Sequence, residues 1–137
     1  SKPDNLAVTS VGVILIQEDP GNNAQVARIV AFRVKDSKLA TVAQFNPDHF
    51  SDGGSKFMTT DEESSGIIDV TSMIAKPGDA KKYFYFNAQI HTAGAYAVRP
   101  DLTTKTKSGI LKFNQKTLEG GAYYSLVISD WKTVFGS

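Results

Sequence analysis

The chain has 137 residues, which suits a single domain, and 41% of them are hydrophobic, so a buried core is possible. Its formal net charge at pH 7 is +1 and no basic stripe stands out, which argues against nucleic acid as a partner. The chain has no cysteine, so disulfides, thiolate nucleophiles and zinc–thiolate sites are excluded. No apolar run approaches the roughly 20 residues of a membrane span, and we expect no membrane partner.

Four strands with short connections are predicted in the first third of the chain. Apolar and β-branched residues dominate these segments, and turn-forming residues separate them. The expected strands are Leu6–Thr9, Val13–Gln17, Val26–Val34 and Leu39–Phe45. The short turns between them, such as Ser10–Gly12, favour an antiparallel meander.

A second group of strands is predicted after a polar loop over Asn46–Ser55. The expected strands are Lys56–Thr60, Ile67–Val70, Tyr83–Ile90, Ile110–Phe113 and Ala122–Ile128, with one helical turn as an alternative over Asp69–Ile74. The remaining segments are expected to be irregular: a long loop over Thr92–Lys116 and a tail over Asp130–Ser137.

The predicted fold class is all-β, with antiparallel meander sheets and little helix. Two groups of about four strands fit two blades of a β-propeller, with blade-like regions over residues 1–46 and 56–129. A small β-sandwich is the alternative. Two blades would leave open sheet edges, so an isolated chain of this kind is expected either to self-associate through those edges or to be a closed sandwich.

The segment Thr60–Val70 concentrates the chemistry of the chain. Its carboxylates Asp61, Glu62 and Glu63 are consecutive, and like charges this close need a cation or hydrogen-bond donors to offset their repulsion. We expect them in a loop just before a strand, where β scaffolds often place functional groups. They form either a cation site or a solvated acidic loop. The two following serines are expected to bond local backbone, and no Gly-x-Ser-x-Gly elbow is present.

Four segments resemble, in chain order, elements of the PhoX-type bacterial alkaline phosphatases, which are β-propellers. They are Pro3-Asp4-Asn5-Leu6 with Gly12 and Glu18-Asp19 after it, Glu63-Ser64-Ser65-Gly66, Asn87-Ala88-Gln89-Ile90-His91, and Leu118-Glu119-Gly120-Gly121. The resemblance implies that the chain is the C-terminal part of a larger exported propeller, periplasmic or extracellular, whose loops hold calcium, with iron in the characterised phosphatases. The cysteine ligand of those phosphatases cannot come from this chain.

The candidate metal ligands are Glu63, Asp4 and Asn5. The resemblance falls on Glu63, whose carboxylate is a hard oxygen donor suited to calcium or iron, whereas Asp61 and Glu62 are expected to be solvated. Asp4 and Asn5 could ligate a cation, although such side chains also initiate turns, and that interpretation is slightly favoured.

The candidate substrate-binding residues are Gln89, His91 and Arg99. Gln89 and His91 are two residues apart, so on a strand their side chains project from the same face, which suits a pair that binds metal or phosphate. His91 could instead bond a nearby carbonyl at the strand end. Arg99, in the predicted long loop, is the arginine placed best to hold phosphate.

Two functions are consistent with these residues. One is the C-terminal part of a secreted metal-dependent phosphoesterase that acts on phosphate esters. The other is a non-catalytic propeller module that binds another small molecule or a partner and holds only structural calcium. In either case the neighbours in an assembly would be the remaining blades or further copies of the chain, and the isolated chain is expected to be inactive.

Overall fold

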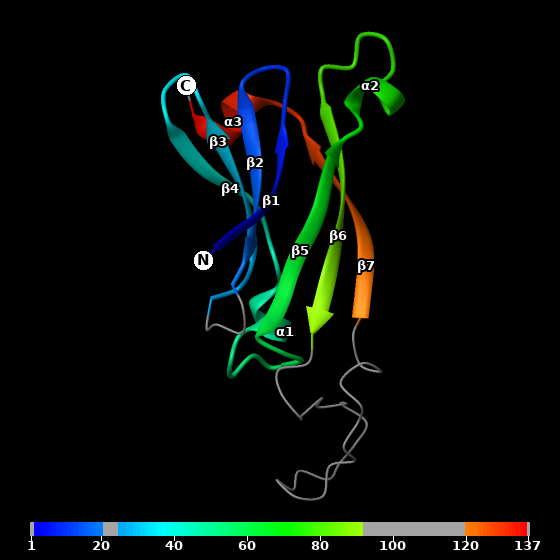
Figure 1. Cartoon of the computed structure of the whole chain (residues 1–137). Helices are drawn as coiled ribbons and strands as arrows, with labels where there is room; N and C mark the ends of the chain where they lie inside the picture. The colour runs from blue at the N-terminus through cyan, green and yellow to red at the C-terminus, as the bar shows by residue number, and fades with distance from the viewer. Residues whose placement is uncertain (1, 21–24, 92–119, 137) are drawn as a thin grey trace, which may run out of the picture.

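The computed structural model describes residues 2–20, 25–91 and 120–136, and it confirms an all-β fold (Figure 1). Its strands are β1 (Lys2–Val8), β2 (Val13–Asp19), β3 (Arg28–Arg33), β4 (Lys38–Gln44), β5 (Asp61–Asp69), β6 (Lys82–His91) and β7 (Gly120–Ile128). Its helices are α1 (Pro47–Phe50), α2 (Thr71–Ile74) and α3 (Trp131–Phe135). No helix in these ranges is long and apolar enough to cross a membrane.

The first sheet is the predicted four-stranded meander, in the order β1-β2-β3-β4 with antiparallel neighbours. Its first turn is closed by Thr9, whose hydroxyl donates to the carbonyl of Val13 (2.9 Å) and accepts from the N–H of the same residue (3.1 Å). Gly12 takes a φ of +73°, which L side chains rarely adopt. The local sequence therefore accounts for this hairpin.

The second sheet has the order β5-β6-β7, again antiparallel. The predicted strand over Lys56–Thr60 is wrong, because this segment bonds back to the α1 region: the N–H of Lys56 donates to Asp48 (3.0 Å) and that of Met58 to His49 (2.7 Å). The helical turn near Asp69–Ile74 is confirmed as α2, and the expected C-terminal tail contains α3. The predicted loop over Thr92–Lys116 and strand over Ile110–Phe113 lie outside the described residues.

The acidic segment lies within β5 and not in a loop before it, which corrects the prediction for this region. Side chains of β5 alternate between the two faces, with Glu62 and Ser64 buried on the inner face. At Gly66 the pairing with β6 shifts by one residue, as in a β-bulge, and this glycine has a φ of +56°. The shift turns Ile67 inward, so polar residues and apolar residues of the same strand share one face.

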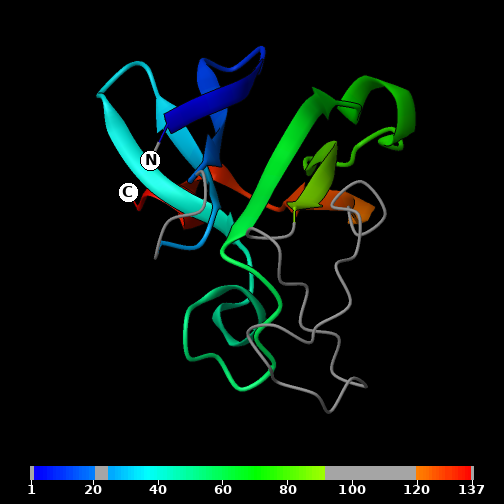
Figure 2. The same cartoon turned by 60° about the horizontal axis from the view of Figure 1, so that its bottom comes forward.

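The core lies between the two sheets, which face each other in Figure 2. The first sheet contributes Ala7, Val13, Leu15, Ile29 and Ala31; the second contributes Ile67, Phe84 and Ile128, and Phe135 comes from α3. One shared core between two antiparallel sheets is compatible with two packed blades and with a small sandwich. Figure 1 shows α1 at the end of the sheets where β5 begins and α2 at the opposite end.

Candidate functional site

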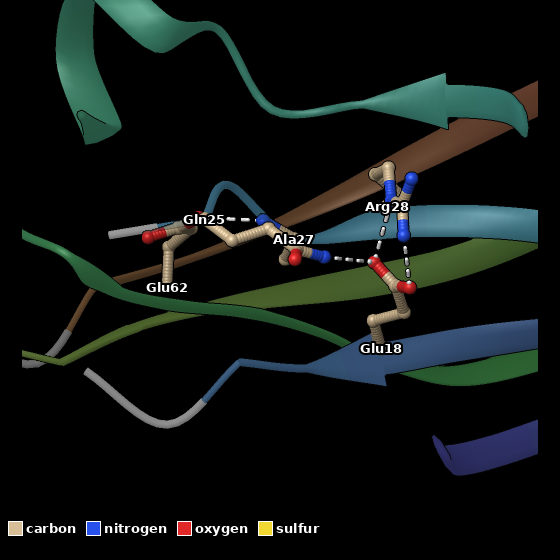
Figure 3. A network of polar contacts seen from close by, with 5 residues as sticks. All are labelled: Glu18, Gln25, Ala27, Arg28 and Glu62. Atoms are coloured by element: carbon tan, nitrogen blue, oxygen red, sulfur yellow. Dashed lines mark hydrogen bonds and ion pairs between the residues drawn. The ribbon is translucent and has the colours of Figure 1, made fainter. Parts of the chain in front are cut away.

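Glu62 is the buried carboxylate of the acidic segment, with 1% of its surface exposed, so the expectation that it is solvated is wrong. Its Oε1 accepts the N–H of Ala27, 35 residues earlier in the chain, at 2.8 Å (Figure 3). Burial raises the pKa of Glu62, and the bond from Ala27 opposes that rise. This contact ties β5 to the segment that leads into β3, and thus joins the two sheets.

A second carboxylate lies nearby in Figure 3, at the end of β2. Glu18 accepts two bonds from Arg28, from Nε at 2.8 Å and from Nη2 at 2.7 Å, and a longer one of 3.4 Å from Nε2 of Gln25. The fork geometry of this ion pair raises the pKa of Arg28. Arg33 likewise donates two hydrogen bonds, from Nε and Nη2, to the carboxylate of Asp36. Its guanidinium carbon lies 4.6 Å from the ring centre of Phe135. Both arginines therefore already have carboxylate partners.

Glu63 lies on the other face of β5 from Glu62. Its Oε1 is 3.8 Å from Nε2 of His91, and Gln89 is its cross-strand partner on β6, so the fold brings Glu63, Gln89 and His91 together. Burial is the largest cause that raises the pKa of Glu63; Asp19 and Asp4 raise it further through their charges, while His91 lowers it. The fold thus gathers acidic groups of β1 and β2 around this glutamate.

Asp4 and Asn5 lie on β1, which contacts β5. Nδ2 of Asn5 donates to Oγ of Ser65 at 3.4 Å and also to the carboxylate of Asp4. The favoured interpretation of these two residues as turn initiators is wrong, because both lie inside a strand. The structure therefore brings both of them to the face of β5 that carries Glu63. Arg99 lies outside the described residues.

Calcium is usually held by six to eight oxygen ligands, and iron by several histidines and carboxylates. Within residues 2–20, 25–91 and 120–136, no group of three or more histidine, aspartate or glutamate side chains is placed to hold a metal ion. Glu63, Asp4 and His91 are close enough to interact electrostatically, but they do not form such a group. The described side chains therefore do not make a complete ligand set for calcium or iron.

A cleft of about 220 Å³ lies between the two sheets, and the sequence did not predict it. Its described lining is mostly apolar, with Ala27, Ile29, Ala43, Phe45, Phe86 and Tyr124, and its polar lining consists of Arg28, Gln44, Asn46 and Ser64. The rings of Phe86 and Tyr124 are stacked, with centroids 5.4 Å apart and planes inclined by 22°. The cleft combines an aromatic wall with a few polar groups, which is the usual composition of a small-molecule site.

Ser64 reaches this cleft from the inner face of β5. Its surface is 0% exposed, and its Oγ has no hydrogen-bond partner in the described part of the chain. The expectation that both serines bond local backbone is therefore wrong for Ser64. A strand assignment over the acidic segment would have placed Ser64 and Glu62 on one buried face, since they are two residues apart.

Comparison with known proteins adds no family: no family model, no curated protein and no solved structure matches the chain. The fold and the site define an all-β structure of two antiparallel sheets with a cleft between them. The relationship to the PhoX-type phosphatases stays a prediction.

Proposed function

We propose that this chain is a non-catalytic β module that binds a small molecule in the cleft between its two sheets. The observation that carries the proposal is the concave, mostly apolar surface around the stacked rings of Phe86 and Tyr124, which opens beside the buried hydroxyl of Ser64. Pockets for drug-sized ligands have volumes of roughly 300–1,000 Å³. The cleft of about 220 Å³ is smaller, so it suits a molecule of one or two rings.

The side chains around the cleft support binding better than catalysis. General acid–base catalysis needs a group that can exchange a proton near neutral pH within hydrogen-bond reach of the substrate. The described lining of the cleft contains neither a carboxylate nor a histidine. Ser64 would need an adjacent base to act as a nucleophile, and its Oγ has no hydrogen-bond partner among the residues described.

The proposal is tested by titrating the protein with a panel of one- and two-ring aromatic molecules while recording amide NMR spectra. Ala43 lines the cleft, so Ala43→Phe should fill it, whereas Thr41 lies exposed on the same strand and Thr41→Phe is the matched control. We expect binding to the original protein and to Thr41→Phe, and its loss in Ala43→Phe. Binding that survives in Ala43→Phe, or no binding to any protein, would contradict the proposal.

The phosphoesterase function remains a second candidate, because Glu63 lies beside His91 and close enough to Asp4 and Asp19 for their charges to act on it. Its test uses the full propeller that the sequence resemblance implies, supplied with calcium or iron. Turnover of a phosphate ester that is lost in Glu63→Ala would support it, and absence of turnover would contradict it. Calorimetry with calcium on the same proteins tests whether the metal is purely structural. In that case Glu63→Ala should weaken calcium binding although the protein has no phosphatase activity.

A further inference from the structure

Four strands lie at the edges of the two sheets, and three of these edges carry features that discourage further pairing. β1 contains Pro3 and Asp4, has a register shift in its pairing with β2, and contacts β5. β5 contains three carboxylates and the shift at Gly66. β4 begins with Lys38 and contacts α3. Proline, charged side chains, bulges and covering elements are the usual means by which a sheet edge avoids another strand.

The fourth edge strand, β7, has neither the charges nor the irregularity of the other three. Its nine residues, Gly120–Ile128, include no charged residue and no proline, and its pairing with β6 continues without a register shift. In the described part of the chain no further strand lies beyond it in the sheet (Figure 1). Backbone N–H and C=O groups of an antiparallel strand alternate between its two sides, so about half of those of β7 point away from β6. This edge is therefore a template for another extended strand.

The strand that fits this edge best is β7 of a second copy of the chain. β7 is uncharged and the whole chain has a formal net charge of +1, so two copies approach each other without strong repulsion. A twofold axis at Tyr124, the middle residue of β7, makes the pairing antiparallel and gives it the full length of the strand. Tyr123, which is 92% exposed, then lies opposite Ser125 of the second copy and gains a cross-strand neighbour. A charged peptide would find no opposite charge on β7.

We infer that two copies of this chain associate through the free edges of their β7 strands, in antiparallel pairing. The two three-stranded sheets then join into one sheet of six strands, in the order β5-β6-β7-β7-β6-β5. Each copy uses the same edge, so the contact closes on itself and the assembly stops at a dimer. The inference depends on the sheet edges and not on a ligand in the cleft, so it can fail without affecting the proposed function.

The experiment measures the dimer dissociation constant by sedimentation velocity over a series of protein concentrations. The double variant Tyr123→Lys with Ser125→Lys changes two exposed side chains of β7 and places ammonium groups opposite each other across the twofold axis. We expect it to weaken the dimer by about tenfold or more, because like charges directly across a strand pair repel. The matched control is Leu39→Lys with Thr41→Lys, which adds the same two charges at the same spacing to exposed positions of β4. The control should dimerise as the original protein does.

Amide hydrogen exchange of the original protein gives a second measurement that needs no variant. The N–H groups of β7 that point away from β6 should exchange more slowly as the protein concentration rises, because the second copy then bonds to them. A monomer at every concentration would overturn the inference, as would assemblies that grow beyond two copies.

The remaining outcomes separate the edge of β7 from other surfaces. A dimer that survives the β7 double variant, or one that the β4 control also abolishes, would overturn the inference. Tyr85 is 46% exposed on the same face of the sheet but lies on the central strand β6, so Tyr85→Lys should leave the dimer intact. Loss of the dimer in Tyr85→Lys would show association through the outer face and would contradict pairing of the edges.

Discussion

The two faces of β5 carry the same chemical groups in different surroundings. Glu62 and Ser64 point inward, where Glu62 is 1% exposed and holds the N–H of Ala27, and where Ser64 lines the cleft. Glu63 and Ser65 point outward, where Glu63 lies beside His91 and Ser65 accepts a bond from Asn5. The inner pair therefore connects the sheets and borders a cavity, whereas the outer pair forms a partly exposed polar surface with the start of β1.

The difference shows that three adjacent carboxylates need not form one site. Because side chains of a strand alternate, neighbours in sequence are separated by the sheet itself. Their surroundings also differ: Glu62 accepts a backbone N–H from Ala27, whereas Glu63 lies 3.8 Å from Nε2 of His91. The mutations below test this division, beginning with the change expected to be largest.

Replacing Phe84 by alanine should give the largest loss of stability. Phe84 is 0% exposed in the core between the sheets, and truncation of a buried phenylalanine costs about 3–5 kcal/mol of unfolding free energy. Its neighbour Tyr85 is 46% exposed on the outer face, and Tyr85→Ala should cost under about 1 kcal/mol. Urea denaturation of both variants measures the difference. Equal losses of unfolding free energy would mean that the two faces of the second sheet contribute equally to stability.

Replacing Gly66 by alanine tests how strongly the bulge of β5 depends on a residue without a side chain. Its φ of +56° is strained for an L side chain, and an added Cβ would lie 2.8 Å from Oδ1 of Asn87. We expect a loss of about 1–3 kcal/mol. Gly78→Ala is the control, because Gly78 also has a positive φ but has no atom within 4 Å of an added Cβ. If Gly78→Ala costs as much, the contact with Asn87 contributes nothing.

Replacing Glu62 by alanine should destabilise the protein by about 1–3 kcal/mol, because the N–H of Ala27 loses its acceptor in a buried place. Glu63→Ala removes a partly exposed side chain and should cost less than about 1 kcal/mol. Thermal and urea unfolding of the two variants compare the faces of β5 directly. A larger loss for Glu63→Ala would reverse the roles given to the two residues.

The pH dependence of stability separates the effect of the negative charge of Glu62 from the effect of its size and hydrogen bond. Its pKa is raised above the ordinary value of 4.5, so the folded state binds the proton more tightly than the unfolded state does. The stability linked to this proton is present below about pH 4.5 and is lost as the pH rises through the folded pKa. Glu62→Gln keeps an acceptor without the charge. It should therefore gain stability relative to the original protein as the pH rises from 4 to 7, and a constant difference would contradict this origin.

The smallest expected effect belongs to the pair of Glu63 and His91. Their 3.8 Å separation and partial exposure limit the coupling to less than about 1 kcal/mol in a double-mutant cycle with Glu63→Gln and His91→Asn. Urea unfolding of the two single variants and the double variant provides the measurement. A coupling well above this limit would mean that the outer face, like the inner one, is a main contributor to stability.

Local sequence patterns predicted much of the fold. The four-stranded meander, the strand around Tyr83–Ile90 and the helical turn after Asp69 follow from residue type and spacing, which act over a few neighbours. The motif Glu63-Ser64-Ser65-Gly66 lies in β5, and the two-residue spacing of Gln89 and His91 places both side chains on one face of β6. The strand over Lys56–Thr60 failed because its backbone bonds are made with the α1 region, a choice that residue type does not reveal.

The sequence by itself determined an all-β chain with two groups of strands, because hydrophobic alternation and turn residues operate locally. Only the tertiary structure decided which glutamate is buried, since the partner of Glu62 lies 35 residues away, and which serine lines a cavity, since the cleft exists only between two packed sheets. Burial and cavity shape depend on contacts between distant segments, and a linear pattern does not contain those contacts.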